Sequence, residues 1–316
     1  MTEKGTRMSR PVAFFFTGQG SQYVGMGKEL FDSVPEARAV FEEADDALGF
    51  PLSRLCFEGP EDDLGLTMNT QPATLAVSIA AYRALGMKPI LAAGHSLGEY
   101  SALVAAGSLN LGDAVRLVRK RGEAMLEACP AGEGGMVVLR KLTLEEAGEA
   151  LSKVTAGVAE LANINSPGQY VVSGDKAAME ELVTILGRRH TFVLPVSSPF
   201  HSRKMKPAED IFWPELDSVS FADLEFPIYT NVDARKISSG EEAREALKRQ
   251  ICSSVRWQES VEKMILEDRS DTFIELGPKK ALYERVAVIA SALGREIHRY
   301  RVDDLAGLEE TKAALA

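Results

Sequence analysis

A glycine-bounded pentapeptide, Gly94-His95-Ser96-Leu97-Gly98, constrains the fold of this chain more than any other feature. It follows the apolar stretch Pro89-Ile90-Leu91-Ala92-Ala93 and precedes a segment rich in Ala and Leu that runs to Gly107. An apolar run before a glycine-rich turn predicts a buried strand, and the segment after the turn predicts a helix. The two glycines allow a sharp turn that larger side chains would block. The pattern therefore predicts a strand, a tight turn and a helix, with Ser96 at the turn.

Ser96 in such a turn is a candidate nucleophile. The turn exposes its hydroxyl on strained backbone at the N-terminus of a helix, where it can attack a carbonyl group. Backbone N–H groups at that helix end can stabilise the oxyanion that forms. The pattern leaves one alternative open, a structural turn whose serine only caps the helix.

Length and composition narrow the classes to which the chain can belong. Its 316 residues suffice for one large domain or two unequal ones. No uninterrupted apolar run has the length of a membrane span, and the opening segment, residues 1–7, lacks the apolar core of a signal peptide. We expect that segment to be a short polar tail. We also expect a protein that is neither inserted in a membrane nor exported. The formal net charge of −10 argues against nucleic acid as a partner.

The three cysteines indicate a reducing compartment. Cys56, Cys129 and Cys252 are far apart in the sequence and match neither a metal-ligand spacing nor a disulfide framework. Scattered cysteines in odd number are typical of proteins that keep their thiols reduced. We therefore expect a cytoplasmic protein without a metal site.

A second glycine-rich loop follows the first apolar run. Residues 12–16 are all apolar and predict a buried strand of a parallel sheet, and Thr17-Gly18-Gln19-Gly20-Ser21-Gln22 follows directly. Ligands of α/β proteins bind at the carboxyl ends of such strands. The lysine of a phosphate-binding loop is absent here. A phosphate site is therefore disfavoured, and a plain structural turn is the main alternative.

The rest of the chain predicts one large α/β domain with an insertion. Helices are expected at about 33–48, 70–85 (starting at Thr70-Gln71-Pro72), 110–128, 203–217, 240–252, 256–267 and after Asp304, and strands near 227–230 and 272–278. Between about 134 and 197 the order is strand 136–139, helix 143–154, strands 160–164 and 170–173, helix 176–187 and strand 191–196. That β-α-β-β-α-β order is typical of a ferredoxin-like unit.

The predicted fold class is therefore α/β. A large α/β-hydrolase-like domain with a short parallel sheet is expected from residues 1–133 and 198–316. A ferredoxin-like small subdomain, residues 134–197, is expected to be inserted into it.

A serine nucleophile needs a base within hydrogen-bond reach, and histidine is the usual one. The chain has four histidines, His95, His190, His201 and His298. His95 adjoins the serine and should point away from it, His190 is expected at the surface, and His298 is expected to be partly buried in a strand. His201 lies where the chain re-enters the large domain, beside the expected cleft between the two parts. It is the candidate base, with a structural histidine as the alternative.

An ordered set of short motifs gives the chain a family resemblance. Each motif is weak alone, but the set extends from Phe14 to about Gly277. The motifs are Gly18-Gln19-Gly20-Ser21-Gln22, Gly94-His95-Ser96-Leu97-Gly98-Glu99, Arg121-Gly122, Asn165-Ser166-Pro167-Gly168-Gln169, Phe200-His201-Ser202, Tyr229-Thr230-Asn231-Val232 and Glu275-Leu276-Gly277-Pro278. With this set the chain resembles bacterial malonyl-CoA:acyl carrier protein transacylases and the acyltransferase domains of polyketide synthases.

The resemblance implies a catalytic dyad, with Ser96 as nucleophile and His201 as its base. In this family a backbone carbonyl orients the imidazole in place of an acidic third residue, and the matching position here is Gln250. Such a dyad is expected to activate water less well than a full triad does. The oxyanion would be held by the backbone N–H groups of Leu97 and Gln19, which gives the first glycine-rich loop a role.

The resemblance also implies substrate-binding residues. Arg121 matches the arginine that holds the free carboxylate of the malonyl group, and a planar guanidinium can donate two parallel hydrogen bonds to a carboxylate. From the sequence alone, the cations of 116–121 are equally a solvated helix face. Phe200 matches the malonyl-selective form of the site, where a bulky ring disfavours an α-methyl branch by about 1–3 kcal/mol. Asn165 is a candidate lining residue or a turn-forming asparagine.

One residue departs from the family pattern. Thr17 stands where many relatives have proline before Gly-Gln-Gly. We expect this difference to alter the stiffness of the loop and not the chemistry.

The implied reaction is a ping-pong transfer for fatty acid synthesis. A malonyl group passes from malonyl-CoA through a Ser96 ester to the phosphopantetheine thiol of holo-acyl carrier protein, in a cytoplasmic monomer that needs no cofactor. Such carrier proteins are acidic, so the basic residues that flank the subdomain are candidates to attract them, with a solvated surface as the alternative. These residues are Arg188, Arg189, Arg203, Lys204 and Lys206.

Three other functions remain open at this point. The chain could be a discrete acyltransferase or acyl hydrolase that serves a modular polyketide synthase. It could be a serine hydrolase or thioesterase of the α/β-hydrolase class, although the oxyanion motif typical of esterases is absent. It could also be a non-catalytic binding module that has kept the fold.

Overall fold

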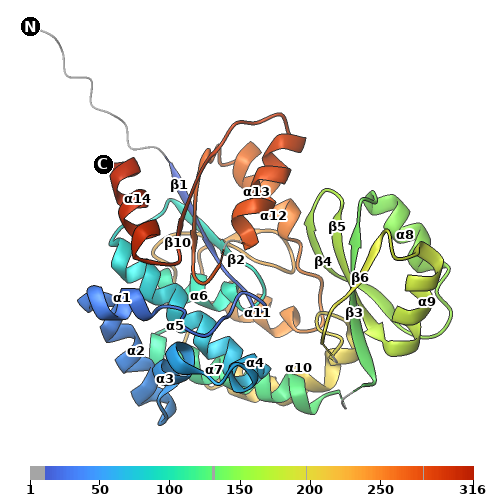
Figure 1. Ribbon diagram of the computed structural model, residues 1–316, viewed down its shortest axis with the longest axis horizontal. Helices are drawn as coiled ribbons and strands as arrows, with labels where there is room; N and C mark the ends of the chain where they lie inside the picture. The colour runs from blue at the N-terminus through green and yellow to red at the C-terminus, as the bar shows by residue number, and fades with distance from the viewer. Residues whose placement is uncertain (1–10, 130–131, 197, 280) are drawn as a thin grey trace, which may run out of the picture.

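The computed structural model describes residues 11–129, 132–196, 198–279 and 281–316 (Figure 1). The expected tail at residues 1–7, Pro130 at the expected end of a helix, and Ser197 at the expected subdomain boundary lie outside the described residues. Within them, the strands form a six-stranded and a four-stranded sheet. The α/β class predicted from the sequence is confirmed.

The six-stranded sheet is mostly parallel. Its strands, in order across the sheet, are β10 (His298–Val302), β9 (Thr272–Leu276), β1 (Val12–Phe16), β2 (Leu91–Gly94), β7 (Ile228–Tyr229) and β8 (Lys236–Ile237). The four pairs from β10 to β7 are parallel, and β7 pairs with β8 antiparallel. β1 is buried along its whole length. This is the burial expected of a parallel strand that is covered on both faces.

Helices cover both faces of this sheet (Figure 1). Phe14 and Phe16 point to one face and belong to the larger core, whereas Phe15 points to the other face and packs against Trp257 and Phe273. The helices of the larger core are α1 (Lys28–Ser33), α2 (Pro35–Leu48), α3 (Leu52–Glu58), α4 (Glu61–Gly65), α5 (Thr67–Leu85), α6 (Gly98–Ala105), α7 (Leu111–Glu127), α10 (Lys206–Asp217), α11 (Gly240–Gln250) and α14 (Leu305–Leu315). Those of the other face are α12 (Trp257–Leu266) and α13 (Ala281–Ala292).

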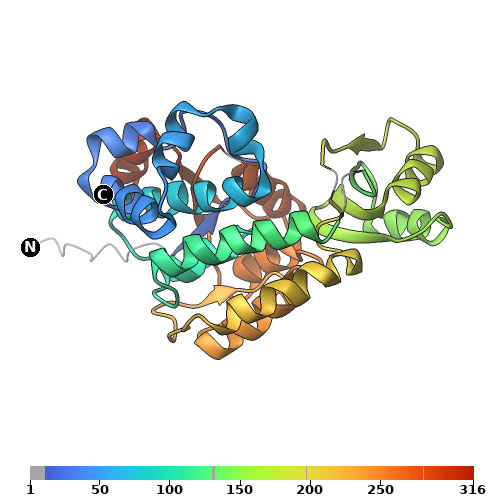
Figure 2. The ribbon, with the colours of Figure 1, turned by 90° about the horizontal axis from the view of Figure 1, so that it is seen from below.

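The four-stranded sheet is antiparallel and lies at one end of the molecule (Figure 2). Its order is β4 (Ala159–Ser166), β5 (Gln169–Asp175), β3 (Gly134–Arg140) and β6 (Thr191–Val193), with α8 (Leu144–Ser152) and α9 (Lys176–Leu186) between the strands in sequence. The β-α-β-β-α-β order matches the expected ferredoxin-like unit. Its boundaries at 134 and 197 stay a prediction.

The two sheets are joined along β4. Ile164 N–H donates to the carbonyl of Val255 at 3.0 Å, and Val255 N–H donates to the carbonyl of Ala162 at 2.8 Å. This ladder attaches the small sheet to the segment that leads into α12.

Two local expectations were wrong. The helix expected to start at Thr70 begins at Thr67, so Pro72 lies inside α5. The extra turn is held by Thr70, whose hydroxyl donates to the carbonyl of Leu64 at 2.5 Å. His298 lies in a strand as expected, but its side chain is exposed, because β10 is the edge of the sheet and its first residue faces solvent.

Candidate active site

Ser96 lies in the tight turn between β2 and α6. Its φ of 53° is in the left-handed region, where residues other than glycine are strained. A Cβ at Gly94 would lie 1.9 Å from the carbonyl of Gly98, and a Cβ at Gly98 would lie 2.1 Å from the carbonyl oxygen of Phe16. The two glycines are therefore required, because the chain crosses itself and β1 at this point.

Asn231, after β7, holds the turn. Its Oδ1 accepts from the Ser96 N–H at 2.6 Å, and its Nδ2 donates to the carbonyl of Gly94 at 2.7 Å. Its own N–H donates to Oε2 of Glu99 at 3.1 Å. Sequence reasoning gave Asn231 no role, although its place in a shared motif was the available signal.

Ser96 and His201 are in direct contact, with 2.7 Å between Oγ and Nε2. Nδ1 of His201 faces the carbonyls of Gln250 at 3.0 Å and Ser253 at 3.2 Å. Carbonyl oxygens only accept, so Nδ1 carries the proton and Nε2 is the free acceptor for the serine hydroxyl. Burial, and after it the charge of Arg121, lowers the pKa of His201 to about 4. The imidazole is therefore neutral near pH 7 and able to take a proton.

Arg121 points from α7 into the same site, and its side chain is only 1% exposed. Nη1 donates to Oε1 of Gln71 at 2.8 Å, and Nη2 donates to Oε1 of Gln250 at 2.9 Å and to Oγ of Ser96 at 3.3 Å. The guanidinium lies over the ring of Tyr100. Its Nε has no hydrogen-bond partner within the described ranges, and no carboxylate there contacts the side chain. The arrangement is a buried cation beside the serine, held by amide and hydroxyl oxygens and not by a carboxylate.

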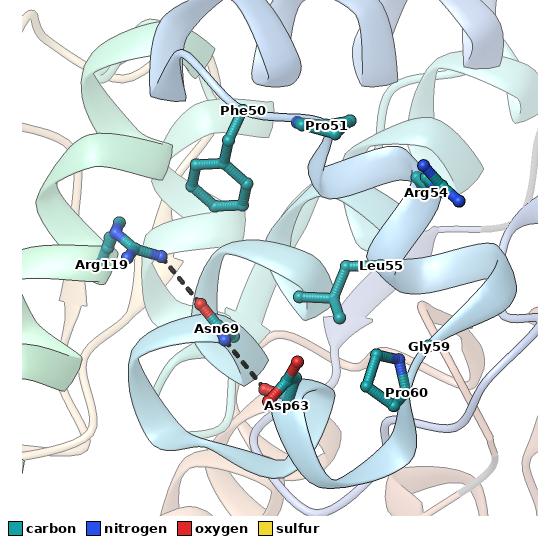
Figure 3. Close-up of a pocket in the computed structure, with 9 residues that line it drawn as sticks. All are labelled: Phe50, Pro51, Arg54, Leu55, Gly59, Pro60, Asp63, Asn69 and Arg119. Carbon is teal, nitrogen blue, oxygen red and sulfur yellow. Dashed lines mark hydrogen bonds between the residues drawn. The ribbon is translucent and has the colours of Figure 1, made fainter.

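Arg119, two residues earlier on α7, has a different environment. It pairs with Glu123, donates to Asn69 at 2.8 Å and stacks over Phe50. Figure 3 shows it beside Phe50 and Asn69, across a separate pocket from Leu55. That pocket has a volume of about 340 Å³. A solvated helix face, the alternative left open for this run of cations, applies to Arg116 and Lys120, which are exposed, and is wrong for the buried Arg121.

Gln19 and Leu97, the expected oxyanion donors, lie on two loops that touch. A Cβ at Gly18 would lie 2.4 Å from the carbonyl oxygen of His95, so the first loop packs directly on the serine turn. Neither the Gln19 nor the Leu97 backbone N–H donates to a protein acceptor in the part of the chain that the structure describes. The Gln19 side chain donates to Thr67 at 3.2 Å. Each backbone N–H is thus still a candidate donor to an oxyanion, as the resemblance implies.

Asn165 reaches the site from the small sheet. It lies in β4 and not in a turn, which corrects the turn alternative. Its Oδ1 is 2.8 Å from Nε2 of His95, so it supports the residue before Ser96. Burial, followed by the charge of Arg285, lowers the pKa of His95 to about 3, so His95 is neutral and donates this bond. His95 points away from the serine, as expected.

Phe200 lies at the junction of the two sheets. Its ring packs both on the large core and on the cluster that contains Met136 of β3. Its carbonyl accepts from Oγ of Ser173 at 2.7 Å. Phe200 therefore fixes the approach of the chain to His201.

The remaining candidates lie apart from this cluster. Nδ1 of His190 lies 3.1 Å from the carbonyl oxygen of Arg140, on the small sheet.

Among the described residues, no group of three His, Cys, Asp or Glu side chains could hold a metal ion. No helix in the same part of the chain is long and apolar enough to cross a bilayer.

Comparisons with known proteins show the family of the chain. The acyl transferase domain family matches residues 13–301. The malonyl CoA-acyl carrier protein transacylase of Bacillus subtilis (strain 168) is 47% identical over 279 residues, 86% of this chain and 88% of that protein. The transacylase of the same name from Escherichia coli (strain K12) is 42% identical over 278 residues, 85% of this chain and 90% of that protein.

Solved structures of the same kind superpose over nearly the whole chain. The malonyl CoA-acyl carrier protein transacylase of Clostridium perfringens has a TM-score of 0.91 at 40% identity, with 96% of each chain covered. That of Coxiella burnetii has a TM-score of 0.92 at 34% identity, with 98% of each chain covered. The chain therefore belongs to the acyl transferase domain family and, within it, to the malonyl CoA-acyl carrier protein transacylases.

Proposed function

We propose that this chain moves a malonyl group from malonyl-CoA to the phosphopantetheine thiol of an acyl carrier protein, for fatty acid synthesis. One observation carries the proposal: Ser96 lies 2.7 Å from a neutral histidine and 3.3 Å from a buried arginine. The first contact activates the hydroxyl, and the second provides a cation for an acyl group that ends in a carboxylate. The relatives that carry the malonyl transacylase name support the same activity.

In the first half-reaction, the Ser96 oxygen attacks the thioester carbonyl while its proton passes to Nε2 of His201. The carbonyls of Gln250 and Ser253 stabilise the resulting imidazolium. The negative charge that forms on the thioester oxygen is held by the N–H groups of Gln19 and Leu97. The C–S bond then breaks, and the coenzyme A thiolate takes the proton from His201.

The second half-reaction is the reverse with another thiol. The phosphopantetheine thiol gives its proton to His201 and attacks the ester carbonyl. The C–O bond to Ser96 breaks, and the serine oxygen takes back the proton. The free enzyme is restored, and the malonyl group is on the carrier protein.

Arg121 gives this site its preference for a carboxylate. A buried guanidinium without a carboxylate partner can exchange its present amide and hydroxyl acceptors for the malonyl carboxylate, to which it can donate two parallel hydrogen bonds. Since the surroundings exclude water, this pairing is stronger than at a surface. Phe200 would add selectivity against an α-methyl branch, by about 1–3 kcal/mol.

The surroundings of His201 favour transfer over hydrolysis. No carboxylate hydrogen-bonds to His201 within the described ranges, so the third member of a hydrolase triad has no counterpart. A carbonyl stabilises the imidazolium less than a carboxylate does, which disfavours attack by water on the ester.

Docking of the carrier protein, a monomeric state and a cytoplasmic location belong to the same proposal. Three of the expected cations are paired with acids: Arg203 with Glu160, Lys204 with Asp175, and Lys206 with both Glu209 and Asp210. Arg188 and Arg189 are exposed and without an ion pair in the described part of the chain. These two residues are therefore the stronger candidates to attract an acidic carrier.

A second pathway is supported by one comparison. A malonyl-transacylase solved in complex with a type II polyketide carrier protein is 38% identical, with a TM-score of 0.91 and 96% of this chain covered. The carrier proteins of fatty acid synthesis and of polyketide synthesis present the same phosphopantetheine thiol. This chain is therefore also a candidate to transfer malonyl groups to a carrier protein of polyketide synthesis.

Incubation with malonyl-CoA and purified holo-acyl carrier protein tests the proposal by the mass of the carrier. We expect a malonyl increment on the holo form and none on the apo form, which lacks the thiol. Release of coenzyme A with no gain of mass by either carrier would instead support a hydrolase.

A further inference from the structure

Glu99 is a buried acid that the mechanism above does not use. It lies in the first turn of α6 and is 1% exposed. Its Oε2 accepts from Nε2 of Gln250 at 2.7 Å and from the N–H of Asn231 at 3.1 Å. The same two residues hold the nucleophile, because Gln250 also donates to the carbonyl of Ser96 and Asn231 accepts from its N–H. Glu99 is thus built into the support of the serine turn.

The side chain of Gln250 links Glu99 to Arg121. Its Nε2 donates to Glu99, and its Oε1 accepts from Nη2 of Arg121 at 2.9 Å. One amide therefore separates a buried anion from a buried cation. A buried charge is costly unless an opposite charge compensates it. In the resting enzyme, Glu99 supplies this compensation through the amide of Gln250 and does not itself contact the guanidinium.

The charges change when a substrate carboxylate reaches Arg121. Two buried anions then share one cation. The other charged groups that face Glu99 do not remove the excess, because Asp233 and Arg249 are paired with each other at 2.9 and 2.6 Å. Tyr100 on the same helix is neutral, since burial raises the pKa of its hydroxyl.

We propose that Glu99 takes up a proton from solvent when the malonyl carboxylate pairs with Arg121, and releases it when the malonyl group leaves. This inference rests on the proposed function. Glu99 is then a positioning residue that, above about pH 7, is ionised in the resting site and neutral in the loaded site. A protonated carboxyl group keeps one oxygen as acceptor for Gln250 and Asn231, so the support of the turn survives.

The electrostatics of the site agree with such an exchange. Burial raises the pKa of Glu99 to about 7, against the opposing effects of its hydrogen bonds and of the Arg121 charge. A carboxylate on Arg121 cancels the effect of that charge, so the pKa of Glu99 rises further in the loaded site. Malonyl-CoA binding should therefore weaken as the pH rises above about 7, by up to about tenfold per unit, whereas acetyl-CoA binding should not.

The test is calorimetric binding to the Ser96→Ala variant, which cannot be acylated. Titrations with malonyl-CoA and acetyl-CoA at pH 8, in buffers of different ionisation enthalpy, count the protons taken up. We expect close to one proton with malonyl-CoA and none with acetyl-CoA, by the linkage of binding to protonation. Adding Glu99→Gln, which keeps the acceptor and loses the charge, should abolish the uptake and leave malonyl-CoA binding at pH 8 at least as tight.

Two results would overturn the inference. Malonyl-CoA could bind without proton uptake, or the uptake could persist in the Glu99→Gln variant, which would assign the proton to another group. The comparison of malonyl-CoA with acetyl-CoA needs no Glu99 variant, so it decides the matter even if that variant does not fold. Absence of malonyl-CoA binding would contradict the proposed function itself.

Discussion

The six-stranded sheet is covered on both faces, whereas α8 and α9 cover one face of the four-stranded sheet and the other face meets Phe200. The turn with the nucleophile, the buried Arg121 and the carbonyl of Gln250 all belong to the first region. The small sheet reaches the serine turn through the contact of Asn165 with His95. Burial on both faces lets a sheet hold strained backbone and buried charges, because tightly packed surroundings leave them no other arrangement. Substitutions at the site residues of the first region should therefore lower the rate of malonyl transfer strongly. Substitutions in the second region should change that rate only slightly.

The largest effect is expected from a pair of histidines, one in each region. His201→Ala removes the base, which should lower kcat/KM for malonyl transfer by about 10³-fold. His190→Ala, on the small sheet, should leave the rate within about twofold, because among the described residues its imidazole hydrogen-bonds to the carbonyl of Arg140, away from Ser96. Steady-state assays with holo-carrier protein measure both. Equal losses in the two variants would contradict the division between the regions.

A pair of arginines on α7 sharpens the comparison within the large region. Arg121→Ala should lower kcat/KM for malonyl-CoA by about 100-fold, since a buried charge-assisted pair is worth about 2–3 kcal/mol. Acetyl transfer should fall little, so the malonyl-to-acetyl ratio is the measured quantity. Arg119→Ala is the matched control, and its ratio should not change, because Arg119 pairs with Glu123. A fall in both substrates would mean that Arg121 has only a structural role.

The pH dependence of acylation tests the burial of His201. Its pKa is lowered to about 4, and the base acts only when it is neutral. The rate of malonyl-enzyme formation should therefore be flat between about pH 5 and 6.5 and fall by about tenfold per unit below pH 4. Rapid-quench measurements give this rate. A fall in the rate with its midpoint near pH 6.5, the ordinary pKa of histidine, would show that water reaches the site.

The smallest effects are expected in the small sheet. Asn165→Ala removes the acceptor for His95 and should lower the rate by about fivefold, the equivalent of one lost hydrogen bond of about 1 kcal/mol. Thr143→Ala is the control, since it removes the capping box of α8. It should lower the free energy of unfolding by about 1 kcal/mol and leave the rate unchanged. A rate loss in both variants would show that the stability of the small sheet, and not the Asn165 contact, matters.

The sequence predicts local structure best where one short segment determines it. The turn at Ser96 is set by two glycines and an apolar strand, and the cap of α7 is set by Asn110, whose side chain accepts from the N–H of Asp113. The β-α-β-β-α-β order could be predicted for the same reason. α13 was not predicted, although Leu282, Val286 and Ile289 give it one apolar face.

Buried polar contacts across the fold could not be predicted in this way. Gln71 and Gln250 meet Arg121 across 50 and 129 positions in sequence, and nothing in their own segments indicates it. The local pattern made Ser96 a candidate nucleophile and the position of His201 made it a candidate base, each with a structural alternative, whereas the role of Arg121 came from the family motifs. The structure adds their contact, and their catalytic roles stay a prediction.

Intact-protein mass spectrometry after brief incubation with malonyl-CoA tests the central claim most directly. We expect a malonyl increment on the wild-type chain, none on Ser96→Ala, and loss of the increment when holo-acyl carrier protein is added. An increment that persists in Ser96→Ala, or release of coenzyme A with no adduct at any time, would contradict a malonyl-serine intermediate at this site.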